Sequence, residues 1–219
     1  MSRLIYIADP MCSWCYGFGP ELAALLEGLP GLPIEVVVGG LRPYNKGVMD
    51  AALKKDLQEQ WQKVGERTGL PFSFDFFTKE NFVYDTEPAC RAVVAARLIA
   101  PQASLYVFHE IQRAFYSEGK DVTDGKVLAP IATKALAEQG HTVSEADFLA
   151  TWNSDVVIKA TNEDFLLSEK WEIRGFPTLI LERGKQLDLV TAGYVAMPRL
   201  VELLETIVGQ EAEQGSTSA

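Results

Sequence analysis

The sequence predicts an α/β fold in which a helical insertion interrupts one α/β domain. A β-branched run near the N-terminus is followed by a helical pattern and by a second β-branched run at 34–40, which is the order of a βαβ unit. Two further strand-like runs flank Gly184, and the roughly one hundred residues in between show helical periodicity. The expected parts are a discontinuous α/β domain at 1–44 and 151–209, a helical insertion domain at 45–150, and a disordered tail at 210–219.

The composition argues against several classes of protein. The chain has 219 residues with 47% hydrophobic content, enough for a globular core, and a net charge of −10. This charge repels phosphate backbones and anionic lipid head groups, so we expect neither nucleic acid nor a membrane surface as a partner. Asp9 and Pro10 break the N-terminal apolar run before it reaches signal-peptide length, and no run approaches the roughly 18 apolar residues of a spanning helix. A cytoplasmic location is the expectation.

The first βαβ unit begins with a buried strand at 3–8, which an Asp-Pro pair ends. A helix from Cys15 to about Leu29 follows because leucines recur at helical spacing, and Pro20 should bend it in an early turn. The run at 34–40 is continuous in β-branched residues. It therefore predicts an interior strand that runs parallel to the first.

The middle of the chain is predicted to be helical. Thr86 should cap one helix, ahead of a proline in its first turn, and Gly140 should end another. The phenylalanine-rich run at 72–77 is the one uncertain strand, and we expect its rings in the core of the insertion more than at the rim of a substrate groove. The predicted helices cover 48–68, 86–100, 104–118, 124–139 and a short segment that begins at 144.

The last part of the chain returns to strands. A helix at about 154–170 precedes two strands that meet in a turn at 182–185. A final helix at 198–208 carries leucine and isoleucine at helical spacing, and Gly209 should end it.

Two of the three cysteines, Cys12 and Cys15, are separated by two residues where the first strand gives way to a helix. The N–H groups and the positive dipole end of a helix favour a thiolate at that position. The spacing places Cys12 at the helix start and Cys15 one turn further on the same face, so both sulfurs can join in one disulfide ring while Cys12 stays exposed. This predicts thiol–disulfide exchange, in which Cys12 forms a mixed disulfide and Cys15 resolves it.

Two other interpretations of the cysteine pair stay open. Half a zinc site would need two more ligands, and the chain offers only Cys90, His109 and His141, each singly placed, so no metal is expected. Inert, packed thiols are the other interpretation, although the order of strand, turn, cysteine pair and helix favours redox chemistry. Cys90 stands among small residues, and we expect it to be buried.

A second signal is Pro177, which follows Phe176 and opens a strand-like run. A cis Phe176–Pro177 bond would expose the backbone of Phe176 beside the cysteines, where an extended substrate could pair with it. An ordinary trans proline at the start of an edge strand is the alternative. Trp14 is either a substrate contact or a surface aromatic packed on the insertion, and Asp9 is expected in a turn or helix cap more than as a proton acceptor.

Together these features resemble the thioredoxin superfamily, and the long helical insertion makes the chain similar to its DsbA-like group. The resemblance covers nearly the whole chain and depends on CSWC at 12–15, the proline-bearing helix after it, the insertion, and GFPT at 175–178. Within the group it is most similar to cytoplasmic FrnE-like and 2-hydroxychromene-2-carboxylate isomerase-like proteins. It implies a thioredoxin fold with a large all-helical insertion, with Cys12 as nucleophile, Cys15 as resolving thiol and Pro177 as a cis-proline facing them.

The resemblance also implies a function. The isomerases of this group generally carry serine at the first motif position and bind glutathione without cycling a disulfide, whereas this chain has cysteine at both positions. We therefore predict a thiol–disulfide oxidoreductase or isomerase that acts on protein or small-molecule disulfides and thiols through a redox-active Cys12–Cys15 disulfide, without a bound cofactor and with glutathione as a candidate co-substrate. The alternatives are a glutathione-dependent isomerase or transferase and a redox-sensing or chaperone-like binding module, and a homodimer stays open. The residues expected to contact substrate are Ser13, Trp14, Phe176 and Pro177.

Overall fold

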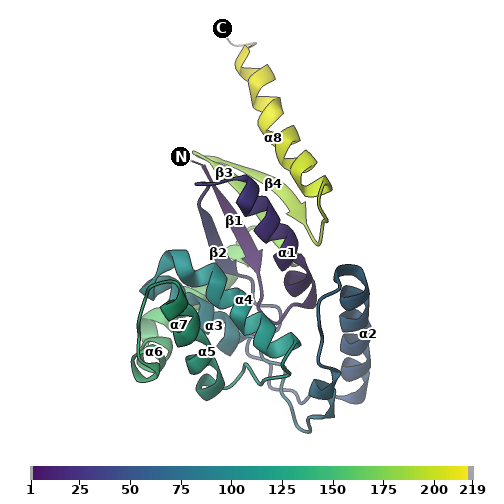
Figure 1. Ribbon diagram of the computed structural model, residues 1–219, viewed down its shortest axis with the longest axis vertical. Coiled ribbons are helices and arrows are strands. Elements are labelled where there is room, and N and C mark those ends of the chain that lie inside the picture. The colour runs from purple at the N-terminus through teal and green to yellow at the C-terminus, as the bar shows by residue number, and fades with distance from the viewer. Residues whose placement is uncertain (1, 217–219) are drawn as a thin grey trace.

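Four strands from the two ends of the chain form one mixed sheet in the computed structural model, which describes residues 2–216 (Figure 1). The strands are β1 (Ser2–Ala8), β2 (Ile34–Val38), β3 (Thr178–Arg183) and β4 (Gln186–Ala192). They lie in the order β2-β1-β3-β4; β1 is parallel to β2 and antiparallel to β3, and β3 and β4 form a hairpin. The predicted α/β fold with a helical insertion is confirmed.

The helices fall where the apolar periodicity predicts them, with shifts at their ends. Asp50, Asp124, Ser144 and Ser154 each accept a backbone N–H in the first turn of the helix that follows, which satisfies donors that the helix itself leaves unpaired. The helices are α1 (Ser13–Gly28), α2 (Ala51–Thr68), α3 (Glu87–Ile99), α4 (Ser104–Tyr116), α5 (Gly125–Glu138), α6 (Glu145–Trp152), α7 (Asp155–Lys170) and α8 (Arg199–Ser216), with short 3₁₀ turns at Phe74–Thr78 and Pro101–Ala103.

One predicted helix start in the insertion is wrong, and one predicted capping side chain makes no capping hydrogen bond. The second helix begins at Ala51 and not at 48, because Val48 forms an isolated bridge with Val83. Thr86 is the N-cap residue of α3, as predicted, but its side chain makes no hydrogen bond to the first turn of the helix. Its hydroxyl accepts the N–H of Arg42 at 3.1 Å, and so ties the start of α3 to the segment that follows β2.

The prediction that β2 is an interior strand is wrong, because β2 lies at the edge of the sheet. Two of its outer backbone groups are nevertheless paired. Asp164 of α7 accepts the Val38 N–H at 2.9 Å, and Arg97 of α3 donates to the Val36 carbonyl at 2.6 Å. These two side chains also form an ion pair, at 2.8 Å, so two helices close the border of the sheet and bury the apolar run.

The final helix extends further than predicted. Gly209 does not end it, and α8 continues to Ser216, so residues 210–216 are helical where the sequence predicts a disordered tail. The last three residues of that predicted tail, 217–219, lie outside the described residues. The division into domains at 1–44, 45–150 and 151–209 stays a prediction.

The main hydrophobic core runs from the sheet into the insertion without a break. Leu4 and Tyr6 of β1 point toward the helices of the insertion, while Ile5 and Ile7 point to the opposite face, as the alternation of a strand requires. The phenylalanine-rich run forms a 3₁₀ turn and not a strand, and Phe76 and Phe77 pack around Trp61 in the core. The same core therefore joins the C-terminal end of β1 and the start of α1 to the insertion.

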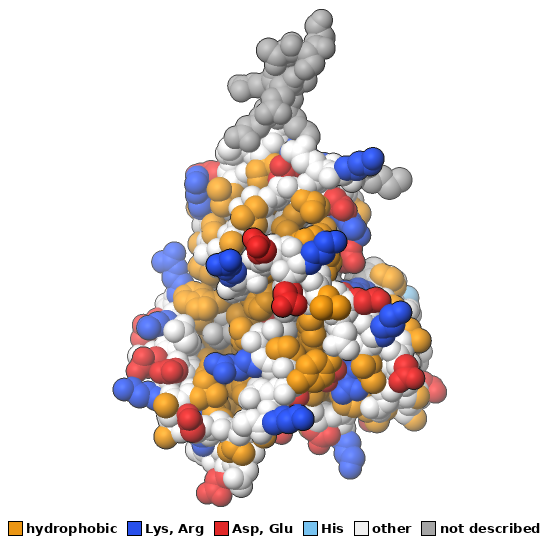
Figure 2. All heavy atoms as spheres, turned by 180° about the vertical axis from the view of Figure 1, so that it is seen from behind, with side chains coloured by type: hydrophobic (Ala, Val, Ile, Leu, Met, Phe, Trp, Pro, Cys, Tyr) orange, Lys and Arg blue, Asp and Glu red, His pale blue; other side chains and the backbone are white. Residues whose placement is uncertain are grey.

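The surface carries charges of both signs. On the face shown in Figure 2, basic and acidic side chains are interspersed, and apolar side chains are exposed in stretches between them. None of the described helices combines the length and the apolar composition that a bilayer crossing requires.

Candidate functional site

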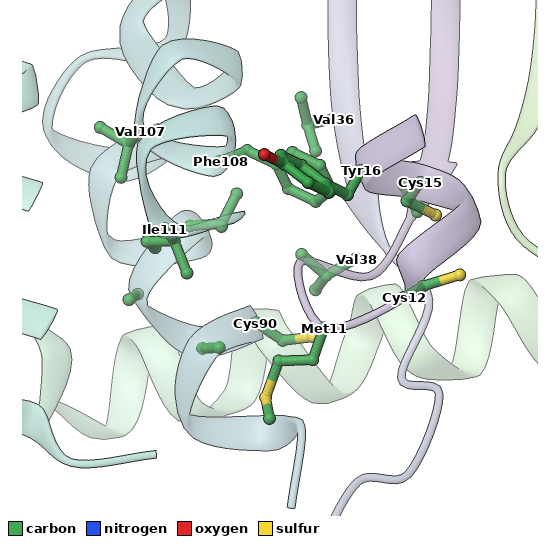
Figure 3. Close-up of a cluster of buried hydrophobic side chains, with 14 of the residues drawn as sticks. Met11, Cys12, Cys15, Tyr16, Val36, Val38, Cys90, Val107, Phe108 and Ile111 are labelled. Carbon is green, nitrogen blue, oxygen red and sulfur yellow. The ribbon is translucent and has the colours of Figure 1, made fainter. Parts of the chain in front are cut away.

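The two motif cysteines lie where β1 passes into α1. Cys12 is the N-cap residue of α1, with an extended backbone, and Cys15 lies in the first turn. Figure 3 shows both sulfur atoms on the same side of the helix start, as the spacing predicts. Cys12 is only 7% exposed and Cys15 is fully buried, so the expectation that Cys12 stays exposed is wrong. Both are free thiols in this structure.

The sulfur atoms have few and specific neighbours. The Cys12 thiol donates to the carbonyl oxygen of Phe176, with 3.7 Å between sulfur and oxygen. Burial raises the pKa of Cys15 well above its ordinary value, and its hydrogen bond with Cys12 raises it further, while a hydrogen bond from the backbone N–H of Asp9 opposes the shift. Cys15 therefore holds its proton strongly, next to the more accessible Cys12.

The segment before β3 forms the opposite side of the site. The Phe176–Pro177 peptide bond is cis, and Pro177 is buried with its carbonyl accepting the N–H of Gly193 at 2.7 Å. The Phe176 ring lies against Gly39, where an added Cβ would stand 2.1 Å from a ring carbon. Only glycine fits at that position, because any side chain would displace the ring that borders Cys12.

An open groove of about 890 Å³ runs beside Cys12. One wall is a face of α7, whose lining residues are spaced three and four apart, and the other walls are the loop after β2 and the segment before β3. Tyr44 donates to Asn162 at 2.7 Å across the groove. The α7 residues are Asn162, Phe165, Leu166, Ser168 and Glu169, and the remaining walls include Gly39, Gly40, Leu41, Tyr44, Arg174 and Phe176.

The predicted substrate contacts separate into two groups. Trp14 and Phe176 line the groove with Cys12. Ser13 is half-buried at the first position of α1 and does not line the groove. Pro177 is buried next to Phe176 and does not line the groove either. Two of the four predicted contacts are therefore placed to touch a molecule in the groove.

Trp14 is held from two directions. Its indole N–H donates to Gln60 of α2 at 3.3 Å, and its ring packs on Tyr194, with centroids 5.6 Å apart. Tyr194 in turn donates to Glu21 of α1 at 3.0 Å. Trp14 thus packs on the insertion and also lines the groove, and its contact with substrate stays a prediction.

Sequence reasoning missed part of the support beneath Cys12. Tyr84 donates to the Met11 carbonyl at 2.6 Å, and the Cys90 thiol donates to the Asp9 carboxylate at 3.4 Å. The predicted burial of Cys90 is confirmed. Asp9 carried a local signal, since it directly follows a buried strand, but Tyr84 and Cys90 lie far from their partners along the chain and carried none.

The histidines lie away from the cysteines in contacts of their own. Burial lowers the pKa of His109 to about 4, and the His141 ring contacts Gln102 at 2.6 Å. Among the side chains that the structure describes, no three of His, Cys, Asp or Glu are grouped so that they could share a metal ion.

The comparison with known families fits this geometry. The profile of the DSBA-like thioredoxin domain matches residues 4–205, which is nearly the whole chain. The chain belongs to this DSBA-like thioredoxin family. The thioredoxin fold with a helical insertion, inferred above from the motif and the layout, is the fold of that family.

Members of the family with solved structures are similar over almost their full length. A candidate protein disulfide isomerase from Nitrosomonas europaea is 35% identical, with a TM-score of 0.86 over 95% of this chain and 98% of that one. The cytosolic disulfide reductase DsbM from Pseudomonas aeruginosa is 28% identical, with a TM-score of 0.76 over 95% and 99% of the two chains, and has also been solved with GSH.

Two more distant likenesses extend the comparison. The ClpXP adapter protein SpxH from Bacillus subtilis (strain 168) is 22% identical over 98% of this chain and 70% of its own length. A 2-hydroxychromene-2-carboxylate isomerase is 17% identical, with a TM-score of 0.62 over 99% of each chain, and shares the fold. The resemblance to the DsbA-like group is confirmed, and at the level of the family the activity is that of a thiol–disulfide oxidoreductase.

Proposed function

We propose that this protein exchanges disulfides with protein or small-molecule substrates through Cys12 and Cys15. The observation that carries the proposal is the placement of two neighbouring thiols at the N-terminus of α1, with Cys12 bordering an open groove and hydrogen-bonded to Phe176. The free N–H groups and the dipole of α1 favour negative charge on the sulfur at the N-cap.

The reaction has two exchange steps. The Cys12 thiolate attacks one sulfur of a substrate disulfide, so a Cys12–substrate disulfide forms and the other substrate sulfur leaves as a thiolate that takes up a proton. Cys15 then gives up its proton and attacks the Cys12 sulfur, which forms the Cys12–Cys15 disulfide and releases the second substrate thiol. Two electrons pass from the protein dithiol to the substrate disulfide.

The groove suggests how a substrate is held during this exchange. Trp14 and Phe176 offer apolar surface next to Cys12, and the Phe176 backbone can pair with an extended segment. Glutathione is the proposed reductant of the Cys12–Cys15 disulfide, supported by the relative solved with GSH and by polar groove residues such as Asn162 and Arg174. A cytoplasmic location, which is that of the DsbM relative, makes net reduction or isomerisation the proposed direction.

Insulin reduction with dithiothreitol or glutathione tests the proposal. The wild type should accelerate the reaction, Cys12→Ser should abolish the acceleration, and Cys15→Ser should accumulate a mixed disulfide with the substrate. Activity that survives Cys15→Ser and requires glutathione would instead indicate a glutathione-dependent isomerase or transferase. A wild type that binds reduced insulin chains without accelerating the reaction would indicate a binding module.

A further inference from the structure

Asp9 hydrogen-bonds the Cys12 loop, the groove wall after β2 and α3, and we propose that it is the positioning residue for the Cys12 sulfur. This inference deepens the proposed function, because it concerns the presentation of the same sulfur to the groove. Asp9 does not line the groove, because its side chain is fully buried below the Cys12 loop.

The carboxylate of Asp9 joins elements that are distant in sequence. Its Oδ1 accepts the N–H of Met11 at 2.8 Å, within the Cys12 loop. Its Oδ2 accepts the N–H of Leu41 at 2.7 Å, in the groove wall after β2, and the thiol of Cys90 at 3.4 Å, on α3. The Thr86 hydroxyl at the start of α3 hydrogen-bonds the same carboxylate.

These contacts satisfy a buried anion with uncharged donors. Burial raises the pKa of Asp9, and the N–H groups of Leu41 and Met11 and the side chains of Thr86 and Cys90 oppose that shift. A buried carboxylate without such donors would be strongly destabilising. The number of donors that converge here therefore indicates a site that requires an acceptor-only side chain.

The geometry of the Cys12 loop follows from these bonds. The Met11 N–H is held by Asp9, and the Met11 carbonyl accepts the Tyr84 hydroxyl at 2.6 Å. The Cys12 N–H donates to the Asp9 carbonyl at 3.0 Å. The backbone on both sides of the Met11–Cys12 peptide bond is thus held, which fixes the direction of the Cα–Cβ bond of Cys12. The hydrogen bond of the Cys12 thiol to the Phe176 carbonyl then orients the sulfur.

The hydrogen bond to Leu41 holds the groove wall that follows β2. Leu41 follows Gly39 and Gly40, and the Phe176 ring lies on Gly39. By holding both Met11 and Leu41, Asp9 holds the Cys12 loop at a set distance from the wall on which Phe176 rests.

Asp9→Asn tests this role with a side chain of nearly the same size. The asparagine amide carries an NH₂ group in place of one carboxylate oxygen, and this donor must then face the N–H of Met11 or of Leu41. We expect the first-turnover attack of Cys12 on 5,5′-dithiobis(2-nitrobenzoate), in a Cys15→Ser background, to slow by about tenfold, the rate equivalent of one misplaced hydrogen bond. Alkylation of Cys12 by iodoacetamide, located by mass spectrometry, should slow in the same proportion.

Asp164→Asn is the matched control, because Asp164 is also a buried carboxylate that accepts a backbone N–H at the end of β2. Both substitutions should lower the free energy of unfolding in urea, but the control should leave the Cys12 rates within about twofold of wild type. Equal slowing in the two variants, or a wild-type rate in Asp9→Asn, would overturn the positioning role.

Two further variants keep the test decisive if Asp9→Asn does not fold. Cys90→Ala and Thr86→Val each remove one donor from the carboxylate, and together they should slow the Cys12 rates by about threefold. A wild-type rate in that double variant would overturn the proposal. Alkylation by iodoacetamide involves no disulfide exchange, so it tests positioning independently of the proposed function. A Cys12 alkylation rate that is lower in Asp9→Asn than in Asp164→Asn supports positioning even if the wild type reduces no disulfide.

Discussion

At the scale of single residues, the site depends on contacts that leave no room for another atom. Gly39 is the clearest case, because the Phe176 ring occupies the space where its side chain would be. Phe176 in turn presents its carbonyl to the Cys12 thiol. A change of one methyl group at Gly39 must therefore move Phe176, and with it the acceptor beside the sulfur.

Gly39→Ala should lower kcat/KM for disulfide reduction by about tenfold, which corresponds to about 1.4 kcal/mol of transition-state stabilisation. The reason is the displaced Phe176 ring and carbonyl. Steady-state kinetics of insulin reduction measure the effect, at a temperature where circular dichroism shows the variant folded.

Gly28→Ala provides the matched control for this substitution. An added Cβ at Gly28, at the end of α1, meets nothing within 4 Å, so kcat/KM should stay within about twofold of wild type. A Gly39→Ala enzyme with wild-type kinetics would show that the Phe176 position does not matter for the reaction.

At the scale of elements, α1 depends on α4 for its support. His109 of α4 packs against Gly19 of α1, and its buried Nε2 has no hydrogen-bond partner among the described residues. Burial lowers the pKa of His109 from 6.5 to about 4, so the ring stays neutral between the helices. Protonation of His109 is therefore unfavourable in the folded chain.

The stability of the wild type should fall by about 2–3 kcal/mol between pH 7.5 and pH 4.5 through His109 alone. The unfolded chain takes up the proton near the ordinary pKa of 6.5, whereas the folded chain takes it up only near 4, so acid favours unfolding across this window. Urea unfolding at the two pH values, compared between wild type and His109→Leu, measures the difference.

His109→Leu should flatten the pH dependence of the wild type by the stated amount. An unchanged slope in His109→Leu would show that the ring is not kept neutral by its surroundings.

At the scale of the whole molecule, the insertion and the sheet share one core. Tyr6 of β1 packs edge-to-face on Phe108 of α4, with ring centroids 5.7 Å apart. Val36 and Val38 of β2 belong to the same cluster of buried side chains as α3 and α4. The face of the sheet that these residues form is therefore covered by the insertion.

Replacement of residues 45–150 by a short Gly/Ser linker should leave a chain that does not fold cooperatively, because that apolar face of the sheet would lie in water. Near-UV circular dichroism should show no fixed aromatic environment, and urea should produce no sigmoidal transition, while the intact chain shows both. A cooperative transition in the shortened chain would show that the sheet domain is stable alone.

The parts of the fold that the sequence predicts are those with local causes. β-branched runs identify β1 and β2, and capping side chains such as Ser144 and Ser154 identify helix starts. The cysteine pair at the start of α1 is recognisable because its chemistry depends on four consecutive residues.

The parts that the sequence does not predict depend on distant partners. Tyr84 and Met11 are 73 positions apart, Cys90 and Asp9 are 81 apart, and the Asp164 that closes β2 is 126 positions from Val38. The pattern of β2 was misleading for the same reason, since an edge strand covered by helices is as apolar as an interior one. The burial of Cys12 likewise follows from a groove wall that only the folded chain assembles.

The closure of β2 by Arg97 and Asp164 has a consequence for concentrated solutions of the protein. With that border sealed, β4 is the border of the described sheet that a neighbouring polypeptide can reach, and Leu187 and Leu189 on it are 45% and 59% exposed. The paired charges of Arg183 and Asp188 stand beside these leucines and oppose unwanted strand addition. Aggregation on storage should therefore start at this hairpin, and charged substitutions there offer a direct way to suppress it.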